Sequence, residues 1–564
     1  MYACPNCGAN IKFDPATQLM KCEYCGTEIP PTDYMFNRSA EEEKGIDLDA
    51  APSKEAEKDG QEEPDEREEY EVTYYTCPQC GGELITEDTT AATFCSYCGS
   101  SNILEMRVGK EKKPDYIIPF KITKDDCVRE YKKTLNRAIF APNDFRKDET
   151  IERFRGIYMP YWVYDVKAEG TINSRGKVQK RRGDYIYTSH YAVESDVDID
   201  YNGFSYDASS SFEDRLSEAI APFDIKDSTE FRSSYLSGFY ADTSDVDNSL
   251  YGNDAKQMVF SDAAKNIFVS PEYSKHGVSA ADIAASLEKK GAKTTAKFGM
   301  FPVWFLSNKN GDRVSYAVVN GQTGKVAMDI PIDILKYFLG VLIISVPLSA
   351  LLILSNILIG PRVLIMLTMV ISLIVLILAN KQANNLFARE ILFDDKGYNS
   401  KRTGKQVEEY RKLINGNVKV KKAKIKSASG NSGFGTAIGY AAIAAVLGNF
   451  FGAGLIVGLI VFIVLLIINA VNSAAGKNVP KDRVIIKAPT SMKISVTIFP
   501  IITLAVGGLI LLFNPFQDPI YYGVAILGMV MTGYTVARLV GRHNKLSGRK
   551  LPQFNKRGGD ENED

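Results

Sequence analysis

The chain of 564 residues has little histidine and none of the common catalytic motifs. Its three histidines, His190, His276 and His543, fall in no metal-binding or triad pattern, and neither His-Glu-x-x-His nor Gly-x-Ser-x-Gly occurs. The phosphate-binding Gly-x-x-x-x-Gly-Lys-Ser/Thr loop is also missing. These absences argue against a zinc protease, a serine hydrolase, an ATPase and a helicase, so we expect no enzymatic activity.

The chain also lacks an excess of charge of one sign. Its 67 Lys and Arg residues nearly balance 68 Asp and Glu residues, so no global basic excess suggests a nucleic-acid binder. Residues 1–12 lack the basic and then apolar pattern of a secretory signal. We therefore expect the N-terminal part of the chain to lie in the cytosol.

Cysteine is scarce but strongly patterned. Eight of the nine cysteines form four Cys-x-x-Cys pairs, and fourteen residues separate the pairs within each half of an internal repeat. In a reducing compartment this pattern favours a metal site over a disulfide framework. The predicted ligands are Cys4, Cys7, Cys22 and Cys25 in the first repeat, and Cys77, Cys80, Cys95 and Cys98 in the second.

Each repeat predicts a Cys4 zinc ribbon. Two Cys-x-x-Cys turns deliver four thiolates to one tetrahedral ion, and the glycine after each second cysteine lets backbone amides turn toward the sulfurs. Four protein ligands leave no open position, so both Zn²⁺ ions are expected to be structural, and metal binding supplies the folding energy of modules this small. Iron–sulfur and redox-dithiol readings fit the pattern less well. The ninth cysteine, Cys127, lies in a helix-like stretch and is expected to be a core thiol.

Local charge argues against nucleic-acid binding by the ribbons. Residues 77–106 contain no Lys or Arg but several acidic residues, and a Cys4 zinc centre adds about two negative charges. Binding to phosphates depends mainly on Lys and Arg. We therefore expect the ribbons to contact protein.

Between and after the ribbons the character of the chain changes. Residues 41–71 carry fifteen acidic and four basic residues, which predicts a disordered linker. Residues 115–330 predict an α+β domain, with helices near 124–140 and 278–290 and strands at 116–122 and 314–319. Its two similar segments, Met159-Pro-Tyr-Trp-Val163 and Phe301-Pro-Val-Trp-Phe305, predict buried strand aromatics, with ligand stacking as the alternative.

Long apolar stretches are confined to the C-terminal part: 337–359, 362–380, 436–471, 494–513 and 520–540. About 20 apolar residues span a membrane. The third stretch is long and broken near Gly448–Gly452, so it predicts either one span or two. Two spans place every basic loop on one side of the membrane, so the positive-inside rule favours three helical hairpins with both termini cytosolic.

Two further features of this region allow alternatives. Glycines four residues apart between 435 and 458 predict close helix packing, either within the bundle or between copies in a homo-oligomer. No Asp, Glu, Lys or His lies inside the apolar cores, which argues against an ion-coupled transporter; Asn449 and Asn469 are the notable polar positions, near the predicted span ends. Basic residues at 419–426 either mark topology or bind anionic lipid.

The predicted fold class is thus multi-domain: two Cys4 zinc ribbons, a soluble α+β domain and an all-α multi-pass transmembrane bundle. The predicted parts are ribbon 1 (1–29), an acidic disordered linker (30–76), ribbon 2 (77–106), the cytosolic α+β domain (115–330), transmembrane hairpin 1 (337–380), a basic cytosolic loop (381–432), transmembrane hairpin 2 (436–471), transmembrane hairpin 3 (494–540) and a cytosolic tail (541–564).

Several short phrases point beyond zinc ribbons in general. They are Cys77-Pro-Gln-Cys-Gly, Thr89-Thr-Ala-Ala-Thr-Phe-Cys95-Ser-Tyr-Cys-Gly99, Pro114-Asp-Tyr-Ile-Ile-Pro-Phe-Lys121, Met159-Pro-Tyr-Trp162, Phe301-Pro-Val-Trp-Phe305 and Asn320-Gly-Gln-Thr-Gly-Lys325. With them, residues 1–380 resemble a family of bacterial membrane proteins with a transcription-factor-IIB-type zinc ribbon. The resemblance implies SPFH-domain or phage shock protein A-like partners in envelope-stress systems, and a recruitment role.

Three functions follow as hypotheses. The first is a scaffold in the cell membrane that docks soluble partners at the cytosolic face. The second is a membrane-tethered transcriptional regulator, which requires a basic surface on residues 115–330. The third is a transporter or lipid-handling protein, which requires a polar cavity between the membrane helices.

Overall fold

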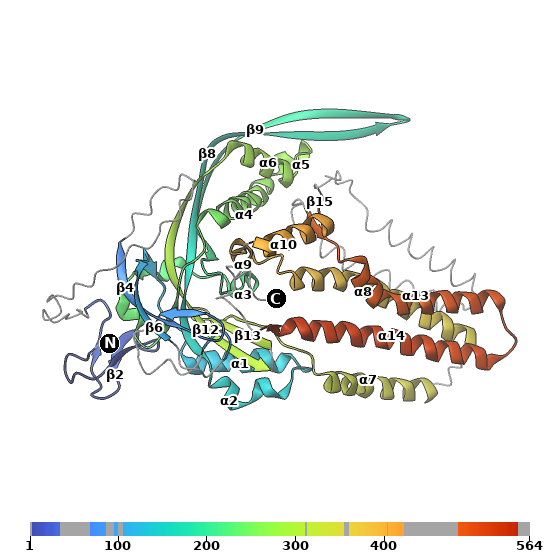
Figure 1. The fold of residues 1–564 in the computed structure, drawn as a ribbon. Helices are drawn as coiled ribbons and strands as arrows, with labels where there is room; N and C mark the ends of the chain where they lie inside the picture. The colour runs from blue at the N-terminus through green and yellow to red at the C-terminus, as the bar shows by residue number, and fades with distance from the viewer. Residues whose placement is uncertain are drawn as a thin grey trace.

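The computed structural model places a sheet-rich body beside a set of long helices that all extend to one side of it (Figure 1). The predicted hairpin 436–471, with its glycines and asparagines, most of the acidic linker and residues 422–432 lie outside the described residues. The residues described are 3–33, 68–85, 95–99, 105–310, 313–354, 360–402, 404–421 and 483–550.

The first ribbon is a small antiparallel sheet of its own. Its strands are β1 (Ile11–Asp14), β2 (Leu19–Cys22) and β3 (Glu28–Ile29), in the order β1-β2-β3. Alternate residues of β1 are buried, as expected for a strand with one face on a core.

A twelve-stranded sheet forms the body, with β10-β7-β12-β8-β11-β5-β4-β6 as its main path. β13 pairs with β12, β14 and β17, and β9 pairs with β8. The strands are β4 (Glu69–Thr76), β5 (Glu83–Ile85), β6 (Glu105–Lys112), β7 (Tyr116–Ile117), β8 (Arg155–Arg182), β9 (Tyr185–Asp207), β10 (Thr229–Glu230), β11 (Tyr240–Asp242), β12 (Lys293–Asn310), β13 (Arg313–Asn320), β14 (Val326–Met328) and β17 (Arg549–Lys550).

The second ribbon belongs to this sheet, which differs from the predicted boundaries. β4 lies in the segment predicted as linker, and it pairs with both β5 and β6. β5 in turn pairs with β11 of the α+β domain. The high content of acidic residues led to the linker prediction and hid the strand signal. Val72 and Tyr74 alternate with charged or polar residues and form the buried face of β4. Ribbon 2 and the domain therefore share one sheet instead of being separate parts.

The two similar tryptophan segments lie on neighbouring antiparallel strands, with Phe301 paired to Met159. Both indoles are buried; Trp162 donates to the Val246 carbonyl at 2.7 Å and Trp304 to the Ile122 carbonyl at 2.9 Å. Two buried strand aromatics are thus confirmed.

The helices predicted near 124–140 and 278–290 are confirmed as α1 and α6. Both begin with a capping box, Thr123 with Asp126 and Ser279 with Asp282. The strand predicted at 314–319 is confirmed within β13, but that at 116–122 shrinks to the two residues of β7. The body's helices are α1 (Lys124–Arg137), α2 (Asp148–Ile151), α3 (Asp214–Ile220), α4 (Ser249–Phe268), α5 (Pro271–Lys275) and α6 (Ala280–Lys290), with short 3-10 turns at Asn143–Arg146, Ile225–Asp227 and Ser233–Leu236.

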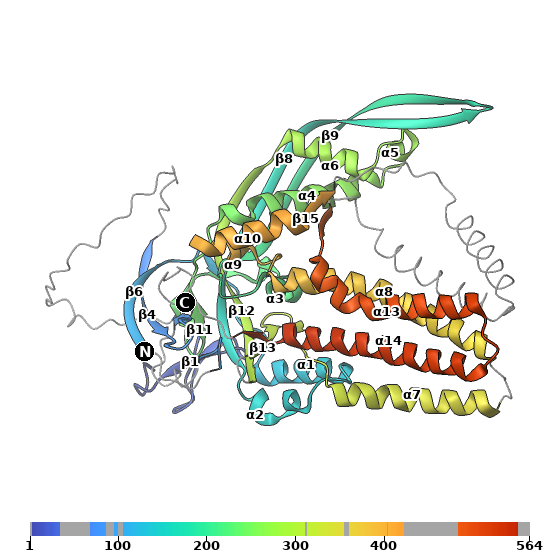
Figure 2. The same ribbon diagram turned by 45° about the vertical axis from the view of Figure 1, so that its right-hand side comes forward.

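Within the described part of the chain, three helices are long and apolar enough to cross a membrane: α8 (Pro361–Glu390), α13 (Thr490–Phe513) and α14 (Asp518–Ser547). A further apolar helix, α7 (Ile334–Leu354), runs beside them (Figure 2). The chain is therefore a membrane-associated protein, and the six-span topology stays a prediction.

The three long helices pack closely. A Cβ on Gly528 would lie 2.7 Å from Thr503 and 3.0 Å from Thr368, and the Ser372 and Thr532 hydroxyls are 2.7 Å apart. Small residues of this kind let membrane helices approach one another.

The described parts of the predicted basic loop (381–432) and tail (541–564) contain helices and strands. α8 continues to Glu390, and the described part of the loop folds into α9 (Lys396–Ser400), α10 (Gly404–Asn417) and β15 (Val418–Lys421), which pairs with β16 (Arg483–Ile486). Residues 541–547 extend α14, and β17 then joins β13. Hydropathy ended α8 at residue 380 and α14 at residue 540, because the residues beyond are polar. In the structure these polar residues stay helical and contact the domain.

Candidate metal centres

The four cysteines of ribbon 1 converge at one point. Their sulfur atoms all lie within 4.8 Å of one another, with 3.6 Å between Cys4 and Cys25 and 3.6 Å between Cys7 and Cys22. Gly8 and Gly26 follow the two knuckles with φ of +74° and +72°, and their amides donate to the Cys4 and Cys22 carbonyls. This conformation favours glycine, which explains the Cys-x-x-Cys-Gly pattern.

Ribbon 2 repeats this geometry. The Cys77 and Cys98 sulfurs are 3.7 Å apart, as are those of Cys80 and Cys95. Gly81 and Gly99 again have positive φ. The eight predicted ligand residues are thus brought together in two groups of four.

The sulfur spacing fits a tetrahedral ion. A Zn–S bond of about 2.3 Å gives a tetrahedron with edges of about 3.8 Å, close to the observed separations. A disulfide needs about 2.05 Å between its sulfurs, so the thiols are too far apart for that bond. Two groups of four cysteines can therefore each hold one metal ion.

The two centres differ in their surroundings. In ribbon 2 all four cysteines are buried, whereas Cys7 and Cys25 of ribbon 1 are exposed. The knuckle tyrosines differ most: Tyr97 is 0% exposed, while Tyr24 in the equivalent position is 84% exposed.

The β-sheet covers ribbon 2. The Tyr97 ring lies edge-on to Phe305 of β12 at 5.9 Å, and the Tyr316 hydroxyl on β13 donates to the Tyr97 carbonyl at 2.8 Å. Burial is the main cause that raises the pKa of the Tyr97 hydroxyl well above its usual range. Ribbon 2 is thus part of the domain core.

Ribbon 1 docks on the body by its other side. Phe13 lies 5.2 Å from Tyr235 and 6.5 Å from Phe239, ring to ring. The Gln18 side chain donates to the Phe120 carbonyl, and the Ser237 hydroxyl to the Ile11 carbonyl, both at 2.7 Å. These contacts fix the ribbon and leave its Cys7–Cys25 edge facing solvent.

Thr27 supports the exposed edge electrostatically. Its hydroxyl lies 3.0 Å from the Cys25 sulfur, and this contact is the main cause that lowers the pKa of the Cys25 thiol to about 6. A lowered pKa favours the thiolate that binds metal.

With this geometry in view, comparison with known proteins gives one relative. The chain is 27% identical over 344 residues to "Uncharacterized protein YdjG" of Bacillus subtilis (strain 168), a match that covers 59% of this chain and 90% of the relative. No protein-family model matches the chain, and no solved structure matches it.

Cys127 also lies where it was predicted. It is buried in α1, and burial raises the pKa of its thiol above the usual range. A core thiol is confirmed.

A second group of polar residues, which the sequence did not indicate, lies where the body meets the long helices. Asp207 and Asp214 are buried on β9 and α3, and Tyr251 of α4 donates to both Asp214 oxygens at 2.9 Å. Lys396, at the start of α9, donates its backbone amide to Asp214 at 2.9 Å. Burial raises the pKa of both carboxyl groups. No sequence signal could have found this group, because Tyr251 and Lys396 lie far along the chain from the two aspartates.

Asp329 forms a related junction. It is 5% exposed and accepts from Arg215 of α3 at 2.6 Å and from Arg389 of α8 at 3.3 Å. Arg389 also donates to the Leu546 carbonyl at the end of α14. This carboxylate therefore connects the body to two of the long helices.

Proposed function

We propose that this chain is a membrane-anchored zinc-ribbon scaffold, whose first ribbon docks a soluble protein at the cytosolic face of a bacterial cell membrane. The contrast between Tyr24 and Tyr97 carries the proposal. Ribbon 2 illustrates what a knuckle tyrosine does when its ribbon is docked on a sheet: it inserts into an aromatic surface and leaves solvent. Tyr24 offers the same group to solvent, beside the exposed Cys7–Cys25 edge.

The chemistry of this edge favours a protein partner. An exposed tyrosine contributes a large, rigid contact with a polar tip, which is typical of protein interfaces. Lys12 and Lys21 of the ribbon lie near Glu23 and Glu28, so they present little unpaired positive charge to a phosphate. Nucleic-acid binding by ribbon 1 remains the less favoured reading.

The charge of the long helices supports an anchor with its body in the cytosol. Six basic residues lie at the helix ends next to the body, against one, Arg362, at the far end of α8, which is the bias that the positive-inside rule requires for cytosolic ends. The six are Lys381 and Arg389 on α8, Lys493 on α13, and Arg538, Arg542 and Lys545 on α14.

We infer that both ions are Zn²⁺, because four thiolates in a closed tetrahedral site are the usual ligands of structural zinc. Elemental analysis of the purified chain should then give two zinc ions per chain. Iron in place of zinc would contradict this assignment.

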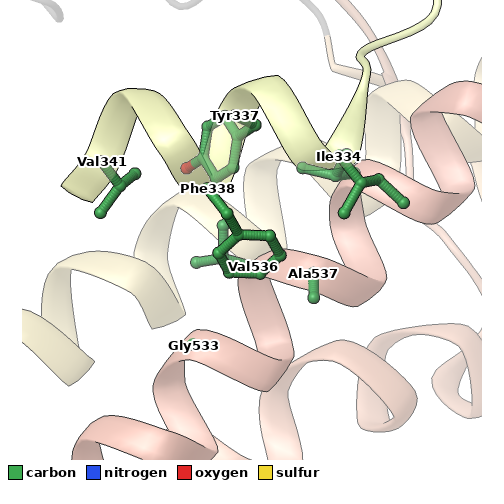
Figure 3. A pocket seen from close by; sticks show the side chains of 8 residues that line it. Ile334, Tyr337, Phe338, Val341, Gly533, Val536 and Ala537 are labelled. Carbon is green, nitrogen blue, oxygen red and sulfur yellow. The ribbon is translucent and has the colours of Figure 1, made fainter. Parts of the chain in front are cut away.

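Of the other hypotheses, transport requires a polar cavity between the membrane helices, and the hollow lined in part by Asn380, Lys493 and Thr497 lies only at the ends of α8 and α13 next to the body. An apolar groove lies between α7 and α14 (Figure 3), and its lining offers no charged side chain to a polar solute. Its residues are Ile334, Tyr337, Phe338, Val341, Gly533, Val536, Ala537 and Val540. Transcriptional regulation would need a basic surface on the body, and residues 175–191 offer one.

A photo-crosslinking amino acid at position 24 tests the docking proposal. In native membranes we expect it to capture a soluble protein, with SPFH-domain and phage shock protein A-like proteins as first candidates from the family resemblance. The matched control is position 269, where Val269 is also exposed but lies at the end of α4. Equal capture at both positions, or none at position 24 with both metal ions retained, would contradict docking by ribbon 1.

A further inference from the structure

The hairpin of β8 and β9 is much longer than the sheet requires. Its strands have 28 and 23 residues. Near the base, Val166, Ala168 and Ile172 pack with residues of α4 and α6 in one apolar cluster. This cover ends near Gly176, where the Lys177 amide donates to the Gly277 carbonyl at 3.2 Å. Residues 182–192 beyond it are all exposed.

Charge divides along this hairpin. The segment 175–191, which we name the distal arm, carries five basic residues and one acidic residue, Asp184. Nearer the base, residues 194–200 of β9 carry four acidic residues and no basic one. The basic residues of the distal arm are Arg175, Lys177, Lys180, Arg181 and Arg182. The hairpin is therefore positive at its tip and negative near its base.

One face of the distal arm combines basic and aromatic side chains. In the strand register Arg182 pairs with Tyr185 and Lys180 with Tyr187, and these pairs lie two residues apart, so they share a face. Tyr185 and Tyr187 are 75% and 59% exposed. An isolated two-stranded ribbon has no core to bury such residues, so a surface outside the hairpin is the natural place for them.

The direction of the arm identifies that surface. Figures 1 and 2, which view the molecule from two sides, show the hairpin extending to the same side of the body as α7, α8, α13 and α14. Tyrosines concentrate at membrane–water interfaces, and Lys and Arg near an anionic leaflet are attracted to its headgroups.

We propose that the end of the distal arm contacts the anionic surface of the membrane that the long helices cross. Lys180 and Arg182 contact phosphate-bearing headgroups, while Tyr185 and Tyr187 enter the interface. This inference rests on the proposed membrane anchoring, but it needs no protein partner. The arm would fix the body at a set angle to the membrane, in addition to the helix ends.

A tryptophan at position 187 tests the contact. Trp162 and Trp304, the two native tryptophans, are buried, so Tyr187→Trp adds an exposed reporter to the full-length chain. In nanodiscs of brominated phosphatidylglycerol we expect the added emission to fall roughly twofold, and in brominated phosphatidylcholine to change little. Salt at about 0.5 M should reverse the quenching, because it screens exposed charges.

Two variants make the test specific. Tyr24→Trp is the matched control, because Tyr24 is also exposed to solvent but lies on ribbon 1, on the side of the body away from the helices (Figure 1). Lys180→Glu with Arg182→Glu, added to the Tyr187→Trp chain, should abolish the quenching of the reporter at position 187 and leave the metal content unchanged.

Three results would overturn the proposal. Equal quenching of the reporters at positions 187 and 24 by anionic lipid would show that the arm has no preferred contact, and quenching that survives the charge reversal would remove its electrostatic basis. A response of the reporter at position 187 to duplex DNA, without any response to anionic lipid, would assign the arm to nucleic acid. Failure of the chain to enter nanodiscs at all would instead contradict the anchoring itself, which separates the two failures.

Discussion

At the scale of single residues, burial of Asp207 and Asp214 destabilises the charged form of each carboxyl group, and the rest of the fold must offset this. Asp207 is 2% exposed, and its Oδ2 atom has no hydrogen-bond partner among the described residues. Burial is the main cause that raises the pKa of Asp207 well above its usual range, and the nearby Asp214 adds to the shift. Groups of this kind favour the folded state only while they hold a proton.

The sign of the pH dependence follows from this shift. The unfolded chain loses the Asp207 proton near pH 4, whereas the folded chain keeps it to higher pH. Between these values the folded state binds more protons, so stability falls as pH rises through the window.

Asp207→Asn should remove this loss of stability at high pH, because an amide has no proton to lose. We expect the variant to gain thermal stability over the native chain at pH 8, and to gain less at pH 5, in detergent-solubilised protein. Asp200→Asn is the control, because Asp200 is exposed, pairs with Lys167 at 2.9 Å and has a lowered pKa. A pH-independent difference for Asp207→Asn would contradict the assignment.

At the scale of elements, the two ribbons share a sequence pattern but not a structural role. Ribbon 2 contributes β5 to the twelve-stranded sheet, where β5 pairs with β4 and β11, whereas ribbon 1 is a separate three-stranded sheet fixed by one face. The same motif thus serves once as core and once as an exposed module.

Metal removal should therefore act in two steps. A chelator should take the ion of ribbon 1 first, because Cys7 and Cys25 are exposed, and native mass spectrometry should record a decrease from two ions to one. Loss of both ions together would contradict this order. Cys7→Ser, which removes a ligand of ribbon 1, should leave the body folded.

Cys80→Ser, which removes a ligand of ribbon 2, should unfold the body, because structural zinc contributes about 10 kcal/mol, comparable to the whole stability of a domain.

The packing of the long helices gives a second prediction at this scale. Gly528→Val introduces atoms where Thr503 and Thr368 already lie, since a Cβ there would be 2.7 Å from Thr503. Overpacking of this kind costs about 1–3 kcal/mol, which should lower the melting temperature measured by circular dichroism. Gly523→Val on the same helix is the control, because nothing lies within 4 Å of a Cβ at Gly523. Equal effects would show that α14 does not pack as described.

At the scale of the whole molecule, the body and the long helices are joined by specific polar contacts. Asp329 binds Arg215 and Arg389, β17 pairs with β13, and Asn544 exchanges two hydrogen bonds of 2.7 Å with the backbone of Ile332. A rigid junction of this kind would hold ribbon 1 and the distal arm at fixed positions relative to the membrane.

Asp329→Asn should weaken this junction by about 2 kcal/mol, because two guanidinium groups then face a neutral amide. We expect faster hydrogen exchange at the ends of α8 and α14, with the ribbons unaffected. In the control, Asp144→Asn breaks an exposed pair with Lys147, for which a change below about 0.5 kcal/mol is expected. Unchanged exchange at both helix ends would mean that the junction does not depend on Asp329.

These contacts also change which variant is useful for finding partners. If the two ribbons were separate modules, Cys77→Ser with Cys80→Ser would remove one ribbon and leave the rest of the chain folded. Because both cysteines are buried in the body, that variant should lose the domain together with any partner. A change at Tyr24 leaves the metal ligands intact and is the sharper probe.

The sequence by itself determined the local features of this protein. Cysteine spacing with its following glycines placed the eight ligands, helical periodicity placed α1 and α6, and apolar length placed the long helices, because each signal lies within a few turns of chain. The tertiary structure alone decided that ribbon 2 is core while ribbon 1 is exposed, that β4 and β17 join the sheet, that Asp207 and Asp214 are buried together, and that Asp329 binds Arg215 and Arg389. Those outcomes depend on pairing between residues far apart in the chain, and a single sequence carries no local signal for such pairing.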